Sequence, residues 1–157
     1  MKSGFIAILG RPNVGKSSLM NALVGEKISI VSPKSQTTRD RITGIRTDGD
    51  CQMIFVDTPG LHEARTALGE QMNRAARTAG TDADVTVVVL DGTKKPTDRD
   101  FAFIERQLKT DRPVYVVVNK TDLAGYERIY PTREKLSYLT RPAEGRGAVR
   151  EIIPTSC

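Results

Sequence analysis

Nearly continuous apolar runs recur along this chain of 157 residues. The runs at residues 5–9, 85–91 and 113–118 are rich in β-branched and other large aliphatic side chains, which is typical of strands that are buried on both faces. A further run at 150–156 predicts a last strand. The pattern therefore indicates at least four strands that share one core.

The segments at 41–47 and 52–57 also read as strands, and they flank the short stretch Asp48-Gly49-Asp50. Two strands joined by so few turn-forming residues are typical of an antiparallel hairpin. We therefore expect a hairpin between the buried runs at 5–9 and 85–91.

Amphipathic stretches separate these runs and predict helices. The first spans residues 15–24, and Gly25 follows it at the position of a C-terminal cap. Others are predicted at 67–79, 97–109 and 132–139. The side chains expected to face the core are Leu19, Ala22, Leu23, Leu68, Met72, Ala75, Ala76, Phe101, Ile104 and Leu108.

This order of elements predicts an α/β fold, in which six strands form a mostly parallel sheet with helices on both faces and the hairpin near one edge. A chain of 157 residues is long enough for a single domain with one sizeable core. Sheets of this class bind ligands at the carboxyl ends of their strands. The turns after residues 5–9, 52–57 and 113–118 should therefore lie on one rim.

Composition narrows the class of protein. The hydrophobic share of 38% and the charged share of 27% are ordinary for a soluble protein, and the longest apolar run is too short to cross a bilayer. No signal peptide is evident, and two cysteines without metal spacing favour a reducing cytoplasm. The net charge of +5 leaves two alternatives open, a solvated basic surface or an anionic partner such as RNA or a lipid surface.

The first turn carries a phosphate-binding motif. Residues 10–17 fit G-x-x-x-x-G-K-[ST] between a predicted strand and a predicted helix, which is the context that the motif requires. Backbone N–H groups and the helix terminus suit an anion, Lys16 can reach the β- and γ-phosphates, and the Ser17 hydroxyl can bind Mg²⁺. The candidate residues of this loop are Gly10, Asn13, Val14, Gly15, Lys16, Ser17 and Ser18.

A base-reading motif follows the strand at 113–118. Guanine offers N1–H and N2–H₂ to the two oxygens of Asp122, whereas adenine would leave that carboxylate unpaired, so the site would reject adenine by about 10⁴-fold or more. Asn119 would brace the loop, and the stem of Lys120 would lie along the ring face. Alone, the tetrapeptide NKTD is a common turn, and its meaning comes from the phosphate loop upstream.

The turn after residues 52–57 is the least specific of the three, because DTPG by itself is also an ordinary strand-ending turn. Its position between the other two motifs suggests that Asp57 holds Mg²⁺ through water. The N–H of Gly60 would then touch the γ-phosphate.

With these three loops in order, the chain resembles the translation-factor class of GTPases, and within it the Era family of bacterial GTPases. The matching stretches are SGFIAILGRPNVGKSSLMNALVGEKISIVSPKSQTTRDRITGIRT, IFVDTPGLHE and VVNKTDL. The resemblance implies a P-loop NTPase fold of the Ras-like G-domain type. It also implies GTP and GDP as ligands, Mg²⁺ as cofactor, and slow hydrolysis of GTP by in-line attack of water.

The resemblance also assigns residues outside the three motifs. A threonine of the mobile loop would close on Mg²⁺, and Thr38 is favoured over its neighbour Thr37, although sequence alone does not separate the two. The end of the chain resembles the last guanine loop of the family, with Ser156 on its serine and Cys157 where the family has alanine. That position acts through its backbone N–H on the guanine O6, so cysteine need not abolish it.

Leu61 follows DTPG at the place where Ras-like proteins carry a glutamine that positions the attacking water. A charge supplied at the transition state, as by an arginine finger, is worth about 10³–10⁵ in rate. Some members of this class with asparagine at the position of Asn13 bind K⁺ there. We therefore expect Asn13 and carbonyls of residues 32–37 to hold K⁺ beside the phosphates, while a plain turn-forming asparagine remains the alternative.

Era proteins continue into a closing helix and a KH domain that binds 16S rRNA of the small ribosomal (30S) subunit. Residues 1–157 lack both, so we expect a truncated G domain of a cytoplasmic protein, whose absent region would supply the rRNA contact and any peripheral contact with the cell membrane. An alternative is a basic RNA- or membrane-binding module, using Lys34, Arg39 and Arg41, in which hydrolysis is negligible.

Overall fold

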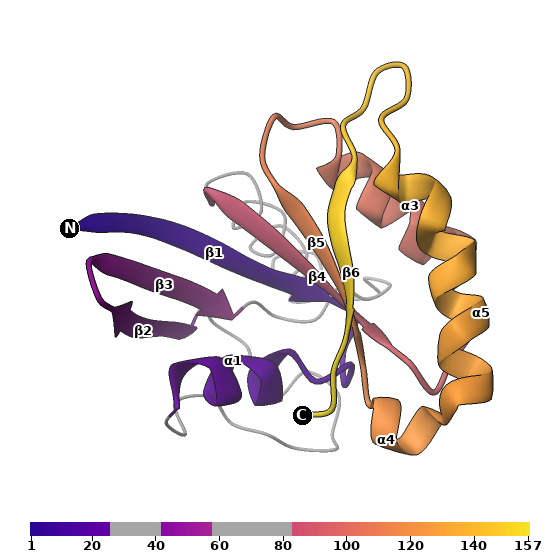
Figure 1. The fold of residues 1–157 in the computed structure, drawn as a ribbon, viewed down its shortest axis with the longest axis horizontal. Helices are drawn as coiled ribbons and strands as arrows, with labels where there is room; N and C mark the ends of the chain where they lie inside the picture. Colours follow the sequence, from indigo (N-terminus) through magenta and orange to yellow (C-terminus); the bar gives the residue numbers. More distant parts are fainter. Residues whose placement is uncertain (26–41, 58–82) are drawn as a thin grey trace, which may run out of the picture.

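The computed structural model describes residues 1–25, 42–57 and 83–157, and it contains the sheet that the sequence predicts (Figure 1). Six strands lie in the order β2-β3-β1-β4-β5-β6, and all neighbours are parallel except β2 and β3. The strands are β1 (Lys2–Gly10), β2 (Ile42–Asp48), β3 (Cys51–Asp57), β4 (Val85–Asp91), β5 (Val114–Asn119) and β6 (Val149–Pro154).

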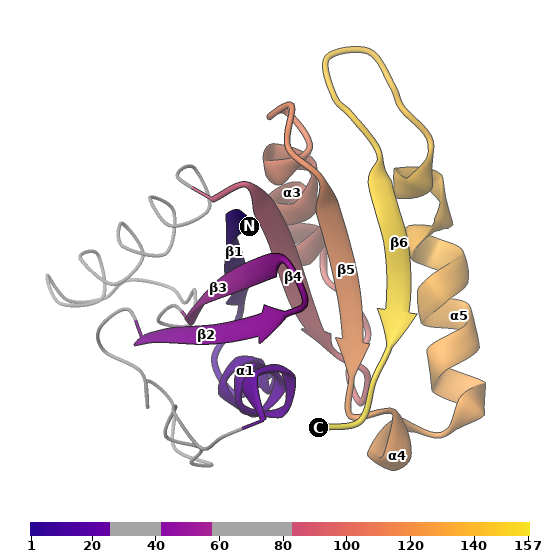
Figure 2. The same cartoon turned by 60° about the vertical axis from the view of Figure 1, so that its left-hand side comes forward.

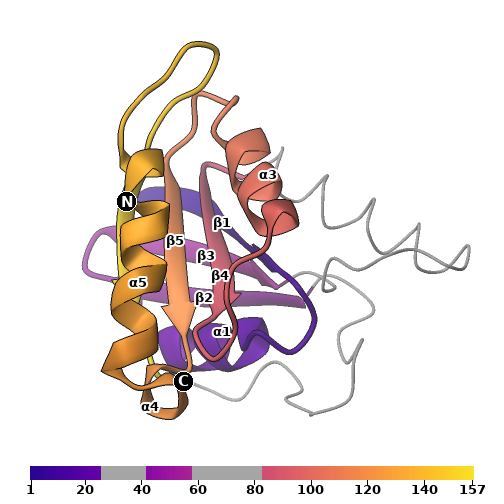
Figure 3. The ribbon, with the colours of Figure 1, turned by 90° about the vertical axis from the view of Figure 1, so that its right-hand side faces the viewer.

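Helices cover both faces of this sheet (Figure 2), and Figure 3 looks onto the face that carries α3 and α5. The described helices are α1 (Lys16–Val24), α3 (Asp98–Gln107), α4 (Thr121–Ala124), α5 (Tyr126–Leu136) and the 3-10 helix η1 (Ser137–Thr140). None of these described helices is long and apolar enough to span a membrane.

Alternation along the central strands divides the core into two layers. In β4, Val88 packs with the cluster that includes Ile104 of α3 and Leu136 of α5. Its neighbour Val89 packs with the cluster that includes Met20 of α1. Because successive side chains of a strand point to opposite faces, each buried strand contributes to both layers, which explains the continuous apolar runs of the sequence.

The hairpin and the first helix agree with the sequence prediction. β2 and β3 pair antiparallel around Gly49, whose φ of 54° lies in the left-handed region that glycine adopts without strain. Helix α1 ends at Val24 and is capped by Gly25, which has φ 85° and donates its N–H to the carbonyl of Asn21. The strands that carry the candidate loops are therefore in the predicted places.

Two details of the helix predictions are wrong. Ala22 is exposed, while Met20 is fully buried, because α1 turns the side of Leu19 and Met20 toward the sheet. The helix predicted at 132–139 begins earlier, at Tyr126, and becomes 3-10 from Ser137. Its interior proline, Pro131, hides the start from sequence reading, but burial of residues on both sides of that proline holds the helix together. The helix predicted at 67–79 lies outside the described residues.

Candidate nucleotide-binding site

The carboxyl ends of the parallel strands meet on one rim, as the topology requires. β1 ends at Gly10, β3 at Asp57, β4 at Asp91 and β5 at Asn119, and these strands pair in register as neighbours. The rim therefore gathers the phosphate loop, the start of the DTPG turn and the base-reading loop, as predicted.

Two glycines of the phosphate loop have no room for a side chain. A Cβ at Gly10 would come within 2.5 Å of the carbonyl oxygen of Val89. A Cβ at Gly15 would come within 2.1 Å of the side-chain nitrogen of Asn119, and Gly15 has φ 99°. Asn13 between them adopts φ 60°, a conformation that asparagine tolerates better than most residues. The loop thus keeps a tight curve with its backbone close to the neighbouring strands.

Lys16, the first residue of α1, is held almost out of water. It is only 7% exposed, and its Nζ donates a hydrogen bond of 2.9 Å to the carbonyl of Arg11. Burial lowers the pKa of Lys16 from 10.5 to about 8, although the nearby Asp57 carboxylate opposes this shift. A buried ammonium of this kind gains from a phosphate anion brought beside it.

Ser17 and Asp57 form the oxygen pair that the sequence predicts for Mg²⁺. The Ser17 hydroxyl donates to the carboxylate of Asp57 at 2.6 Å, and Asp57 is fully buried at the end of β3. A hydroxyl and a carboxylate beside a phosphate loop are the hard oxygen donors that Mg²⁺ prefers. The residues present therefore fit the ion.

Asn119 links the phosphate loop to the two loops that the sequence predicts to bind guanine, at 119–122 and 155–157. Its side-chain nitrogen donates to the carbonyl of Val14 at 3.0 Å, and its side-chain oxygen accepts from the Thr155 hydroxyl and the Cys157 backbone N–H, each at 3.1 Å. All of these contacts are made by one fully buried amide. Asn119 thus braces the loop as predicted, and a guanine O6 would have to share the Cys157 N–H with it.

Lys120 makes a second link, and its partner Asp91 was missed by the sequence reasoning. The Lys120 ammonium donates to the carbonyl of Asn13 at 2.6 Å and to the carboxylate of Asp91 at 2.9 Å. Thr93 donates its N–H and hydroxyl to the other oxygen of Asp91. Burial alone would raise the pKa of Asp91, but these hydrogen bonds outweigh it and hold that pKa below its ordinary value. The signal that could have found Asp91 is its place at the end of β4, on the same rim.

The two guanine loops are also joined through their backbones. Thr121 donates both its N–H and its hydroxyl to the carbonyl of Thr155, at 3.0 and 2.9 Å. This leaves Asp122 exposed in the first turn of α4, and Ser156 is exposed as well. Asp122 and Ser156 thus lie exposed on two loops that are hydrogen-bonded to each other.

A further ion pair ties the phosphate loop to α3. The guanidinium of Arg11 contacts the Asp100 carboxylate at 3.1 Å and donates to the Thr97 hydroxyl at 3.2 Å. Asp100 also accepts the backbone N–H of Thr97, which caps the helix. No sequence motif indicated this contact.

Lys34, Thr37, Thr38, Arg39, Arg41, Gly60 and Leu61, and the carbonyls of residues 32–37, lie outside the described residues.

Comparison with known proteins agrees with this geometry. A family model described as 50S ribosome-binding GTPase matches residues 5–120. GTPase Era of Glaesserella parasuis is 48% identical over 154 residues, which make up 98% of this chain and 49% of that relative. The chain spans about half the length of the curated relatives that it matches.

Two solved structures of Era have similar folds. One is Era in complex with MgGDPNP and nucleotides 1506–1542 of 16S ribosomal RNA, with a TM-score of 0.87 and 37% identity over 99% of this chain and 51% of that one. The other is a variant of Aquifex aeolicus Era bound to GDP and AlF₄⁻, with the same TM-score and identity over 99% of this chain and 52% of that one. This chain therefore belongs to the family of 50S ribosome-binding GTPases, and among known GTPases it is similar to Era.

Proposed function

We propose that this chain binds guanine nucleotides together with Mg²⁺ and hydrolyses GTP slowly to GDP and phosphate. The observation that carries this proposal is the Asn119 amide, which joins the phosphate loop to the two loops that would read the base. Such a link fixes the distance between a polyphosphate site and a base site. A nucleotide is a ligand with both parts.

Each residue of the site has a defined part in this function. The Lys16 ammonium would bind the β- and γ-phosphates, and the backbone of residues 10–17 would wrap them. Ser17, and Asp57 through water, would hold Mg²⁺ together with Thr38, and the ion supplies neutralisation of the charge on the phosphates. Gly60 would donate its N–H to the γ-phosphate. Asp122, Ser156 and the Cys157 N–H would hold the guanine.

Hydrolysis needs no covalent intermediate with the protein. A water molecule attacks the γ-phosphorus in line, and the bond from that phosphorus to the β–γ bridging oxygen breaks. Leu61 has no group that could polarise the water. We therefore include K⁺ in the proposal, held by Asn13 and by carbonyls of residues 32–37, as the source of the missing positive charge.

The relatives are about twice as long as this chain. The whole protein would act in assembly of the small ribosomal subunit. The support is the related Era structure that contains a 16S rRNA fragment. We place this role in the cytoplasm, with rRNA and any membrane contact mostly outside residues 1–157.

The test is a binding titration of the 157-residue chain with GTP, GDP and ATP, followed by measurement of GTP turnover with Mg²⁺. Binding of both guanine nucleotides, no measurable binding of ATP, and slow release of phosphate are expected. Binding without any turnover would instead favour a module that uses nucleotide only as a ligand.

Nucleotide affinity should depend on pH through Lys16. Below its pKa of about 8 the Lys16 ammonium is charged both with and without ligand, so this group does not make the affinity depend on pH. Above pH 8 binding must take up a proton, because the phosphates raise the pKa of the bound ammonium, and the GDP affinity should fall by about tenfold per pH unit. Isothermal titration from pH 7 to pH 9.5 measures this slope. The Lys16→Met variant should bind weakly with less slope, and a level wild-type profile would contradict the assignment.

Replacing Asp91 with asparagine should weaken the binding of GDP and the binding of GTP equally. The carboxylate holds Lys120 against the phosphate loop, and the pair is partly exposed, so its loss is worth about 1 kcal/mol, or about fivefold in dissociation constant. Fluorescent-nucleotide titration measures the effect, with Asp111→Asn as the control at the other end of the sheet. An unchanged affinity in Asp91→Asn would show that Lys120 needs no brace.

A further inference from the structure

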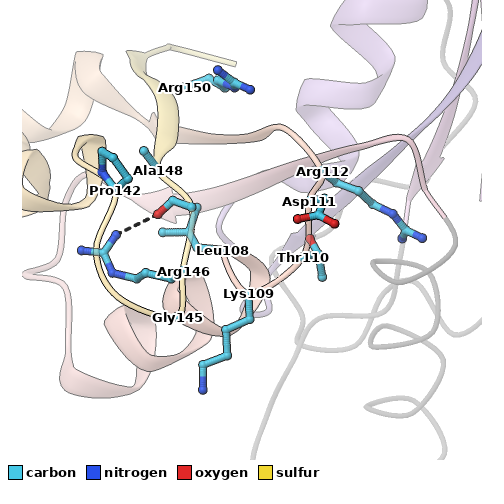
Figure 4. Close-up of a pocket in the computed structure, with 11 residues that line it drawn as sticks. Leu108, Lys109, Thr110, Asp111, Arg112, Pro142, Gly145, Arg146, Ala148 and Arg150 are labelled. Atoms are coloured by element: carbon cyan, nitrogen blue, oxygen red, sulfur yellow. Dashed lines mark hydrogen bonds between the residues drawn. The ribbon is translucent and has the colours of Figure 1, made fainter.

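A basic pocket (Figure 4) is lined by residues that follow α3 and precede β6. It has a volume of about 520 Å³ and lies where the chain leaves α3 at Leu108 and where the loop at 142–148 enters β6. Because β5 and β6 run parallel to β1, their amino ends mark the edge farthest from the phosphate loop. The pocket and the nucleotide site are therefore separate surfaces of one domain.

The frame of this pocket is fixed by hydrogen bonds. The N–H of Gly147 donates to the carbonyl of Leu108 at 2.6 Å, which joins the loop to the end of α3. The Arg146 guanidinium donates to the carbonyls of Arg141 and Gly147, at 3.1 Å each, and lies 5.7 Å from the ring centre of Tyr138. Arg146 thus holds the loop in shape and adds to the positive charge of the pocket. It is less exposed than Lys109 and Arg150.

Positive charge dominates the lining. Lys109, Arg112 and Arg150 line the pocket together with Arg146, and Asp111 is the single carboxylate among the described lining residues. Lys109 and Arg150 are exposed. In Figure 4 the side chains of Lys109, Arg112 and Arg150 point away from one another. Cations spread in this way suit several phosphates along a chain better than one small anion.

Lipid is a poorer match than nucleic acid. Membrane-surface sites combine cations with large apolar side chains that enter the acyl region. The large hydrophobic side chains that the described part of the chain exposes are Met1, Phe5, Ile45, Leu123, Tyr130 and Tyr138, and none of them lines this pocket.

We propose that this pocket, through Lys109 and Arg150, binds the sugar-phosphate backbone of RNA independently of sequence. The choice of RNA as the polyanion rests on the proposed role in ribosome assembly. The surface itself is additional to that role, which places rRNA binding mostly outside residues 1–157. A nucleotide switch with RNA held at its far edge would keep both ligands bound at once, because the two sites share no residue.

The test uses the 157-residue chain with GDP bound and a fluorescent single-stranded RNA, over a range of salt concentrations. Each phosphate contact to a single strand contributes about 0.7 to the slope of log affinity against log salt. Lys109→Gln/Arg150→Gln should therefore reduce the slope by about 1.4 and the affinity at 0.1 M salt by about 25-fold. The matched control is Lys95→Gln/Lys135→Gln, which removes two exposed cations outside the pocket and should change the affinity less than twofold.

Three other outcomes would overturn the proposal. These are equal losses in the two double variants, no loss in either, and binding of phosphatidylglycerol vesicles that depends on Lys109 and Arg150 while RNA is not bound. GTP turnover is measured on separate portions of the same proteins without added GDP or RNA, and it should be unchanged in Lys109→Gln/Arg150→Gln. If only the RNA-binding proposal is wrong, GTP turnover is still observed. If the proposed GTPase function is wrong, turnover is absent from every sample.

Discussion

Replacement of Asp122 by asparagine should convert the chain from a guanine-selective to a xanthine-selective nucleotide binder. In the proposed function the aspartate would accept N1–H and N2–H₂ of guanine, whereas the asparagine amide would face the guanine amino group with a donor of its own. Xanthine carries a carbonyl at C2, to which that amide can donate. The expected change in preference between GTP and xanthosine triphosphate is about 10⁴-fold.

Competition titrations of both nucleotides against a fluorescent GDP measure this preference. Asp122 is exposed, and the loop around it is held by Thr121 and Thr155 rather than by its carboxylate, so the variant should fold. Asp111→Asn serves as a control with the same chemical change away from the rim. If Asp122→Asn kept the parental preference for GTP, the carboxylate would not read the base.

Hydrolysis of GTP should be faster in K⁺ than in Na⁺ by about 10³-fold, the lower end of what a charge supplied at the transition state contributes. The reason is that Leu61 cannot polarise water, so the charge must come from elsewhere. Asn13 lies in the phosphate loop, and its backbone already touches Lys120. Single-turnover hydrolysis at equal ionic strength in the two salts measures the ratio.

The informative variant is Asn13→Gly. Asn13 has φ 60°, which glycine adopts without strain, and the carbonyl that accepts from Lys120 is retained. The side-chain carboxamide alone is lost, so stimulation by K⁺ should disappear while GDP affinity changes little. Equal rates in K⁺ and Na⁺ for the parent chain would remove the ion from the proposed mechanism.

The sequence predicted best where local chemistry and topology agree. The β-branched runs of β4 and β5 allow little besides buried parallel strands, and Gly25 marks the end of α1 because it can adopt a left-handed conformation. Asn119 was expected to brace its loop, because a motif fixes its place on the rim. The structure adds the partners of that brace, Val14, Thr155 and Cys157.

The sequence predicted less where contacts join distant segments without a motif. Asp91 and Lys120 are brought together only by pairing of β4 with β5, and Arg11 meets Asp100 only because α3 starts beside the phosphate loop. Ala22 was predicted to face the core but is exposed, and Met20 is buried instead. Helical spacing alone does not say which side of a short helix turns inward. The early start of α5 was hidden by Pro131, a residue that usually argues against a helix interior.

The three contacts of the Asn119 amide have a kinetic consequence. Because the protein's own groups join the loops, little conformational entropy remains to be lost when a nucleotide binds, and capture should be fast. Release should quicken when the contacts of Asn119 with Val14, Thr155 and Cys157 are broken, because the arrangement that fits the nucleotide is then lost. An accelerator of GDP dissociation would therefore act most directly on residues 155–157, of which Ser156 and Cys157 are exposed.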